Sequence, residues 1–552
     1  MQKEVNIKPC AVQKIETPQG FSVSYKEHLL YSKYNPKKNI LTTVDNLTLL
    51  PGTIILCCSP LLSYGITELL NKLPENCLIV LCEAEKNLYD FSIAEKALPE
   101  SDERIINCTP ESLNTLPLKI YDLAASGLYK RVIRLDMSAG TQFNKDFYDK
   151  LFNTCQDSVM TFWKNRLTLT KFGRRYSRNL FENLHYLADS KPIRDYFCTV
   201  EKPLIVFGAG QSTQTLISSL QRQSVKQSFW SDFFILCADT ALQPLLKNGI
   251  KPDGVFVEEA QSVISKAFIG LPKDIQIFAG LSSIPNISHK AEAGFVSYFF
   301  TEYTSASFIN NLIDQSFMPP ANPPFGSVGL TAVYYALKFR KNENIPVYIA
   351  GLDFSYSTGL THTRGALAGI LRLIHANRLN PPQNYAAAYG LGTEKIPGKN
   401  GHLITTQTLK SYAAMFKNFF AGEKNLYDAG ESGIDLGLPK ADTDCLVANV
   451  SSNEQESETY DKRHCEDEAS SKPLAKELET YLANERKTIE ELRDLLTGHT
   501  ELKGEELIQK IESIAKPREY LYLHFADGYK FSTNQSFLNR IRTEIDFFLK
   551  YL

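Results

Sequence analysis

The segment FGAGQST at residues 207–213 has the composition of an anion-binding turn. Its glycines let a ligand approach the backbone, and the helical composition of residues 215–220 would offer the free N–H groups of a first helical turn to a phosphate. Gly208, Gly210 and Ser212 are therefore candidate phosphate ligands. The same glycines suit a tight strand-to-helix turn that binds nothing, so this segment alone leaves both interpretations open.

A second segment of this kind is PFGSVGLT at residues 324–331, which leads into the apolar run 332–339. Gly326 and Ser327 would lie at the start of a helix, with the Thr331 hydroxyl following within it. A helix start of this kind attracts anions. An ordinary N-cap at Ser327 is the alternative.

A third segment combines an acid, a histidine and an arginine. Asp353 follows an apolar run, and His362, Thr363 and Arg364 follow it in the polar sequence THTR. A carboxylate at a strand end and a histidine suit general acid–base catalysis, and an arginine suits neutralisation of a leaving group. The alternative is a histidine with only a structural role.

Four apolar runs end at glycines or acids, and together they predict where a site lies. In an open parallel sheet the ligand crevice lies at the carboxyl ends of the strands, so these ends are expected to converge. The runs are 204–207, 233–237, 254–257 and 347–350, and the residues that follow them include Gly208, Gly210, Asp239, Glu258, Glu259 and Asp353.

The length of 552 residues is too great for a single hydrophobic core. Apolar runs alternate with helical segments, which predicts an α/β fold with two Rossmann-like parallel-sheet domains followed by a C-terminal helical unit. The predicted boundaries are 1–170 for the N-terminal α/β domain, 171–450 for the central domain, 451–471 for a polar linker and 472–552 for the helical domain.

Two features outside the central sheet leave alternatives open. In the N-terminal domain Glu83 follows a strand-like run, where an acid can bind a ribose, but the turn 59–63 lacks glycines, which favours a structural role. Further along, Asn179 and Asn183 are four residues apart and share one helix face. That helix is either a connector with a solvated basic side or an element that lends an amide to the neighbouring site.

The overall composition disfavours several classes of protein. A net charge of -2 lacks the positive field of nucleic-acid-binding proteins. The absence of a secretion signal and of 18 consecutive apolar residues predicts a cytoplasmic protein with no membrane span. The 11 cysteines lack the spacing of zinc ligands, so we expect free buried thiols and no structural metal.

Several segments, in this order, resemble the bacterial motility accessory factors, which are implicated in glycosylating flagellin with nonulosonic, sialic-acid-like sugars. The same domain type is named after an archaeal 6-hydroxymethylpterin pyrophosphokinase, and part of it is similar to sialyltransferases that use CMP-activated sugars. The similar segments are residues 31–36, 208–213, 237–259, 325–339, 349–365 and 426–434.

The resemblance implies a sialyltransferase-like catalytic domain that transfers a nonulosonic acid from a CMP donor to Ser or Thr of flagellin. It implies His362 as the base, with Asp353 the next candidate. This scheme requires no cofactor beyond the CMP-sugar donor, and both a metal-free and a metal-dependent reaction stay open. The residues assigned to the nucleotide or sugar are Gly208, Gly210, Ser212, Asp239, Asp253, Glu258, Gly326, Ser327, Thr331, Thr363 and Arg364.

The sequence departs from the family in two places and keeps two alternatives open. Gln211 stands where the family commonly has Pro, and Glu258 where it commonly ends a strand with Asp. A pterin pyrophosphokinase would need ATP and a divalent metal held by paired carboxylates, for which Asp239, Asp253 and Asp353 are available. A noncatalytic flagellin-binding protein is the other alternative.

Overall fold

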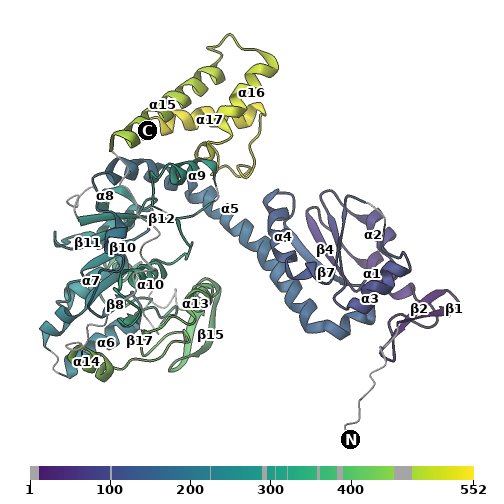
Figure 1. The fold of residues 1–552 in the computed structure, drawn as a ribbon, viewed down its shortest axis with the longest axis horizontal. Coiled ribbons are helices and arrows are strands. Elements are labelled where there is room, and N and C mark those ends of the chain that lie inside the picture. Colours follow the sequence, from purple (N-terminus) through teal and green to yellow (C-terminus); the bar gives the residue numbers. More distant parts are fainter. Residues whose placement is uncertain are drawn as a thin grey trace, which may run out of the picture. The chain divides into compact units, whose positions relative to one another are not determined.

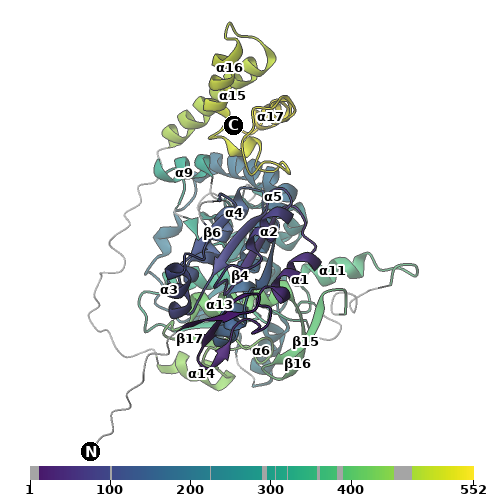
Figure 2. The same cartoon turned by 90° about the vertical axis from the view of Figure 1, so that its right-hand side faces the viewer.

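The computed structural model describes residues 12–99, 102–223, 226–288, 295–304, 306–319, 321–356, 361–381, 389–452 and 475–552. The chain forms two compact units (Figure 1, Figure 2). The first consists of Met1–Lys171 and Leu523–Ser532, and the second of Phe172–Tyr522 and Thr533–Leu552.

The first unit is built on a four-stranded parallel sheet. Its strands are β4 (Thr53–Cys58), β5 (Leu78–Cys82), β6 (Ile105–Cys108) and β7 (Arg131–Asp136), and its helices are α1 (Lys38–Asn46), α2 (Ile66–Lys72), α3 (Lys86–Ala94), α4 (Leu116–Ala125) and the first part of α5 (Lys145–Leu187). The strand order is β6-β5-β4-β7. An antiparallel ribbon of β1 (Gln13–Thr17), β2 (Gly20–Tyr25) and β3 (His28–Leu29) precedes it.

Helices cover both faces of this sheet, which explains its continuous apolar strands. Ile54 and Leu56 pack with side chains of α4 and α5, whereas Ile55 packs with α1 and α2 on the opposite face. Cys57 and Cys58 are buried free thiols on these two faces, as the composition predicted. The prediction was wrong for Cys198, which is disulfide-bonded, and for Cys445, which is exposed.

The second unit contains an eight-stranded parallel sheet. Its strands are β8 (Leu204–Phe207), β9 (Phe234–Ala238), β10 (Gly254–Val257), β11 (Gln276–Gly280), β12 (Val296–Thr301), β13 (Ala321–Asn322), β14 (Val347–Ala350) and β17 (Leu426–Asp428). The helices of this region are α6 (Gln211–Arg222), α7 (Asp239–Lys247), α8 (Pro285–Ser288), α9 (Ser307–Asp314), α10 (Val328–Phe339), α11 (Leu367–Ile374), α13 (Gln407–Phe420) and α14 (Thr443–Ser452).

The chain changes once the side of the sheet on which it adds strands, and we call this point, between β8 and β14, the strand reversal. The spatial order is β13-β12-β11-β10-β9-β8-β14-β17, so the chain adds strands outward from β8 to β13 and then returns to place β14 on the other side of β8. Val347 is paired with Leu204 and Ala350 with Phe207, so the turns after β8 and β14 leave the sheet side by side. Ligands of open α/β sheets bind at such a reversal.

The core of the second unit lies between this sheet and α10. Val206, Leu236, Phe256 and Phe278 point from four neighbouring strands onto the buried side of this helix. Beside the sheet, β15 (Thr393–Gly398) and β16 (Gly401–Thr406) form an antiparallel hairpin that leads directly into α13.

The C-terminal part of the chain is helical, as its apolar periodicity predicted. Its helices are α15 (Ala475–Thr497), α16 (Gly504–Ala515) and α17 (Gln535–Phe548), and α15 packs against both others. Leu523–Ser532, between α16 and α17, belongs to the first unit. There Arg166 of α5 donates hydrogen bonds to the carbonyl oxygens of Leu523 at 3.0 Å and Phe525 at 2.7 Å.

The observed architecture confirms the predicted α/β fold with two parallel-sheet domains and a helical C-terminal region. Most of the polar linker expected at 451–471 lies outside the described residues. Within the described ranges, no helix has both the length and the apolar character that crossing a membrane requires.

Candidate active site

The turns after β8 and β14 contact each other closely. The Gly210 N–H donates to the Gly351 carbonyl oxygen at 2.8 Å, and the Thr213 hydroxyl donates to the Gly208 carbonyl at 2.8 Å. A Cβ added at Gly210 would lie 2.6 Å from the Gly351 oxygen and 2.6 Å from Cγ of Asp353. These glycines therefore allow the turns after β8 and β14 to contact each other, and not only the approach of a ligand.

Asp353 lies at the N-terminus of α6, where a phosphate was predicted. Its carboxylate accepts a hydrogen bond from the Ser212 N–H at 2.9 Å and a second from the Ser212 hydroxyl, which in turn accepts from the Gly351 N–H at 2.8 Å. Burial raises the pKa of Asp353, and the bonds from Ser212 oppose that rise. The structure thus brings Gly208, Gly210, Ser212 and Asp353 together, and the protein's own carboxylate takes one N–H of the helix start.

The end of β17 adds a buried ion pair that the sequence reasoning missed. Lys399, in the turn of the β15–β16 hairpin, pairs with Asp428, and both side chains are almost fully buried. Lys399 also donates to the Gly430 carbonyl at 3.1 Å, and the Gly430 N–H donates to Asp428 at 2.9 Å. The turn-like sequence PGKNG at residues 397–401 could have indicated this hairpin, but nothing in it indicates the partner.

A second group of acids lies at the ends of β9 and β10. The Thr331 hydroxyl of α10 donates to Glu258 at 3.0 Å, and the Thr301 hydroxyl donates to the other carboxylate oxygen. Burial raises the pKa of Glu258. Asp239 is buried at the start of α7, and burial together with the charges of Glu259 and Glu258 raises its pKa to about 7, against the N–H of Thr240.

The start of α10 lies at the same edge of the sheet. Gly326 adopts a left-handed φ of 67°, and a Cβ there would lie 2.9 Å from the ring of Tyr412 in α13. Ser327 occupies the N-cap position of α10, but its side chain makes no capping hydrogen bond. The ordinary N-cap interpretation therefore does not account for this hydroxyl, which is left for other contacts.

The segment after β14 returns to the turn after β8. The Thr363 N–H donates to the Ala209 carbonyl at 2.8 Å, which fixes His362 beside this turn. Nδ1 of His362 lies 3.1 Å from the Thr361 hydroxyl, and burial and the charge of Arg372 lower the pKa of His362. The lowered pKa favours the neutral imidazole, which is the form that can accept a proton.

The structure places the other residues of this segment differently. Arg364 is exposed, whereas the Thr363 side chain is buried and its hydroxyl has no hydrogen-bond partner among the described residues. Asp253 lies at the opposite edge of the sheet, because it precedes β10, and its carboxylate accepts from the Ile235 N–H at 2.7 Å. The structure therefore does not bring Asp253 to the other candidate residues.

The two asparagines of α5 hold two loops at the carboxyl edge of the sheet by hydrogen bonds. Asn179 and Asn183 are fully buried, so they do not belong to a solvated helix face. Their amides hold the loops after β10 and β11 by donating to the carbonyl oxygens of Ala260, Ser282, Leu281 and Ser283.

In the first unit Glu83 is bound by the protein itself. Its carboxylate accepts from the hydroxyls of Ser59 at 2.8 Å and Tyr148 at 3.2 Å and from the Glu85 N–H at 3.0 Å. Burial raises the pKa of Glu83 to about 7 against these bonds. These contacts favour the structural role over ribose binding.

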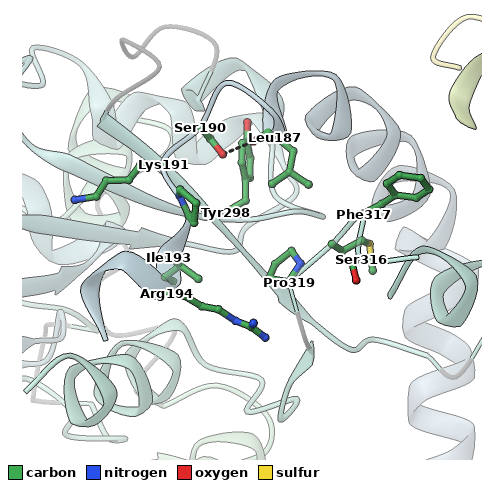
Figure 3. Close-up of a pocket in the computed structure, with 11 residues that line it drawn as sticks. Leu187, Ser190, Lys191, Ile193, Arg194, Tyr298, Ser316, Phe317 and Pro319 are labelled. Atoms are coloured by element: carbon green, nitrogen blue, oxygen red, sulfur yellow. Dashed lines mark hydrogen bonds between the residues drawn. The ribbon is translucent and has the colours of Figure 1, made fainter. Parts of the chain in front are cut away.

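A small cavity lies beside the start of β12, away from the carboxyl edge (Figure 3). Its volume is about 50 Å³, and the Ser190 hydroxyl that borders it donates to the Leu187 carbonyl at 2.7 Å. The volume is too small for a sugar nucleotide. No group of three His, Cys, Asp or Glu side chains placed to hold a metal ion occurs in the described ranges.

The amino-acid sequence is similar to a family model and to a protein of another organism. Residues 175–359 match the family model described as 6-hydroxymethylpterin diphosphokinase MptE-like. A protein of Treponema pallidum (strain Nichols), described as uncharacterized, is 30% identical over 570 residues and aligns with 98% of this chain and 94% of its own length.

The chain belongs to the same family as this Treponema pallidum protein, and its central part is an MptE-like domain. The fold of the chain is similar to that of the MAf glycosyltransferase from Magnetospirillum magneticum AMB-1, with a TM-score of 0.52 over 99% of this chain and 91% of the other at 13% identity. The expected central domain of the pterin-kinase type is thus confirmed, and the fold agrees with the expected resemblance to the motility accessory factors.

Proposed function

We propose that the protein is a glycosyltransferase that moves a nonulosonic acid from a CMP donor to Ser or Thr hydroxyls of flagellin. The fold similarity to the MAf glycosyltransferase supports this class of reaction. The observation that carries the proposal is the Thr363–Ala209 hydrogen bond, because it holds His362 at the strand reversal where ligands of such sheets bind.

In this proposal the acceptor hydroxyl oxygen attacks the anomeric carbon of the sugar. Its proton passes to His362, and the bond from the anomeric carbon to the phosphate oxygen breaks, so that CMP leaves with the electron pair. The Ser327 hydroxyl, the N-terminus of α10 and the exposed Arg364 are the groups available to meet the leaving phosphate.

In this proposal the two aspartates at the carboxyl edge have different roles, because Asp353 stabilises the protein and Asp239 binds the ligand. Asp353 is engaged by Ser212, so its role is to fix the turn beside His362. Asp239 has a pKa of about 7 and can donate a hydrogen bond in its protonated form to the cytosine or the sugar.

The pterin kinase remains the second candidate because the family model bears that name. It would bind ATP and a divalent metal through paired carboxylates. Of the three aspartates considered for this role, Asp253 lies at the amino edge, apart from Asp239 and Asp353.

The decisive experiment is an intact-mass measurement of unglycosylated flagellin after incubation with the protein and a CMP-nonulosonate. We expect a mass increase of one sugar residue per acceptor site. His362→Ala should lower the rate by about 10²- to 10⁴-fold with little change in donor affinity. Asp253→Asn, at the opposite edge, is the control that should keep the rate.

An unchanged flagellin mass with the folded protein would refute the transfer reaction. Calorimetric titrations with the CMP-sugar, with ATP plus a hydroxymethylpterin and with flagellin alone then separate the remaining candidates. Binding of ATP and pterin would favour the kinase, and binding of flagellin alone would favour a noncatalytic role.

A further inference from the structure

The described part of the second unit contains a much larger cavity than the one beside β12. Its volume is about 480 Å³, which is in the range of small-molecule sites. One wall is Ser355 and Tyr356, which follow β14, and the other is the β15–β16 hairpin with its turn at Lys399. We call it the hairpin cavity.

The walls of the hairpin cavity are joined by hydrogen bonds, so its shape is built into the fold. The Tyr356 N–H donates to the Ile404 carbonyl at 2.7 Å, and the Thr405 hydroxyl donates to the Phe354 carbonyl at 2.8 Å. The Lys399 N–H donates to the Gly433 carbonyl at 3.0 Å. The strand β16 is thereby held to the segment after β14, and the turn of the hairpin is held to the loop after β17.

Two side chains that line the hairpin cavity, those of Lys395 and Lys399, carry a positive charge, and others carry an imidazole, an amide, hydroxyls or apolar groups. Lys395, Lys399 and His402 come from the hairpin, and no Asp or Glu is among the described lining residues. Asp428 already neutralises Lys399. Lys395 is exposed and makes no ion pair with any described residue, so its ammonium group adds an unbalanced charge.

Hydroxyl groups complete the lining. Ser355, Tyr356 and Ser432 each contribute one, and such groups both donate and accept hydrogen bonds. They suit a ligand that has several hydroxyls of its own. The unbalanced lysine adds a preference for an anionic group.

The hairpin cavity is fixed to the strand reversal. The Ser432 hydroxyl lies 3.4 Å from the Asp353 carboxylate, and the Ile434 N–H donates to the Asp353 carbonyl at 2.9 Å. Gly433 has a left-handed φ of 103°, and a Cβ there would lie 2.6 Å from Cα of Asp353. A molecule in the cavity would therefore lie next to the residue that caps α6.

We propose that the hairpin cavity binds a small polyhydroxylated anion, with Lys395 and His402 at the anionic group and Ser355, Tyr356 and Ser432 at the hydroxyls. The anion is either the carboxylate of an acidic sugar or the phosphate of a sugar phosphate. This inference stands whether or not the protein transfers sugars, because it rests on the lining alone.

Calorimetric titration of the full chain with four probes tests the inference. The probes are N-acetylneuraminate, glucose 6-phosphate, neutral N-acetylmannosamine and inorganic phosphate. We expect one of the two anionic sugars to bind and N-acetylmannosamine to fail. Preference for N-acetylneuraminate identifies a carboxylate site, and preference for glucose 6-phosphate identifies a phosphate site.

Substitutions locate the binding in the cavity. Lys395→Gln and His402→Gln should each weaken binding of the preferred probe by about tenfold. Lys410→Gln is the matched control, because Lys410 pairs with Glu394 of the same hairpin at 3.0 Å and does not line the cavity. Thermal melting verifies that the three variants keep the stability of the parent.

Three results would overturn the proposal. They are binding of none of the probes by the folded protein, equal binding of the neutral and the anionic sugar, and binding that Lys395→Gln and His402→Gln leave unchanged. The outcome of the flagellin mass measurement does not enter, so the two proposals fail independently.

Discussion

Replacement of Asp239 by Asn should stabilise the second unit at alkaline pH. The carboxyl group of Asp239 is buried at the start of α7, and burial beside Glu259 and Glu258 raises its pKa from 3.8 to about 7. An amide has nearly the same shape and no charge to bury. The effect of the substitution should therefore depend on pH.

The size and sign of the effect follow from the two pKa values. Between pH 3.8 and about pH 7 Asp239 is protonated in the folded protein and ionised in the unfolded chain. The wild-type free energy of unfolding therefore falls as the pH rises through this range. A shift of this size corresponds to about 4 kcal/mol in all, of which roughly 3 kcal/mol falls between pH 5 and pH 8. Asp239→Asn lacks this loss, so its advantage over wild type should grow by that amount.

Urea unfolding at both pH values measures the difference. Trp230, in η4 (Gln227–Asp232), packs on Phe207 of β8 with ring centroids 5.9 Å apart and so reports on the second unit. A Trp163→Phe background removes the tryptophan of the first unit.

A matched control is Asp274→Asn, whose carboxylate is exposed beside Lys251, so no growing advantage at pH 8 is expected there. A difference between Asp239→Asn and wild type that stays constant from pH 5 to pH 8 would refute the reasoning. So would an advantage of the wild type that grows with pH, because it would mean that the ionised carboxylate is stabilised.

Three further predictions concern other contacts. Gly210→Ala places a Cβ 2.6 Å from a carbonyl oxygen of the neighbouring turn, and we expect a loss of about 1–3 kcal/mol in urea unfolding; full stability would show that the turns can separate. Arg372→Gln removes a cation that lowers the pKa of His362, so an NMR titration of that ring should shift upward, and an unshifted titration would exclude the electrostatic contact. Tyr529→Ala should destabilise the first unit by about 1–3 kcal/mol, because this partly buried ring packs on its core; Trp163 fluorescence measures the loss, and an unchanged midpoint would show that the ring is dispensable.

The sequence predicted the strands of the second unit and the carboxyl edge of their sheet well, because buried parallel strands are apolar throughout. The runs at 204–207, 254–257 and 347–350 coincide with β8, β10 and β14. Their order in the sheet could not be derived from periodicity, since a strand that is buried on both faces carries no mark of its neighbours. Only the structure shows that β14 returns to pair with β8.

Only part of the candidate site could be predicted, because the sequence shows which residues follow a strand but not which side chains they contact. Strand ends locate residues such as Asp239 and Asp353, but hydrogen-bond partners from distant segments decide what those residues do. Ser212 was expected to meet a phosphate and instead meets Asp353. The pair of Lys399 and Asp428 joins a hairpin turn to a strand end, and neither residue lies in a pattern that announces the other.

The return of Leu523–Ser532 into the first unit has a consequence for biosynthesis. Domains near the N-terminus usually fold as soon as they leave the ribosome. Here Arg166 and Trp163 lack their contacts with Leu523–Ser532 until almost the whole chain has been translated. At ordinary elongation rates of about 5–20 residues per second, that delay is roughly 20 to 70 s. During this time the nascent first domain exposes the surface around Gly127 that Tyr529 later covers, so that surface stays hydrated until translation is almost complete.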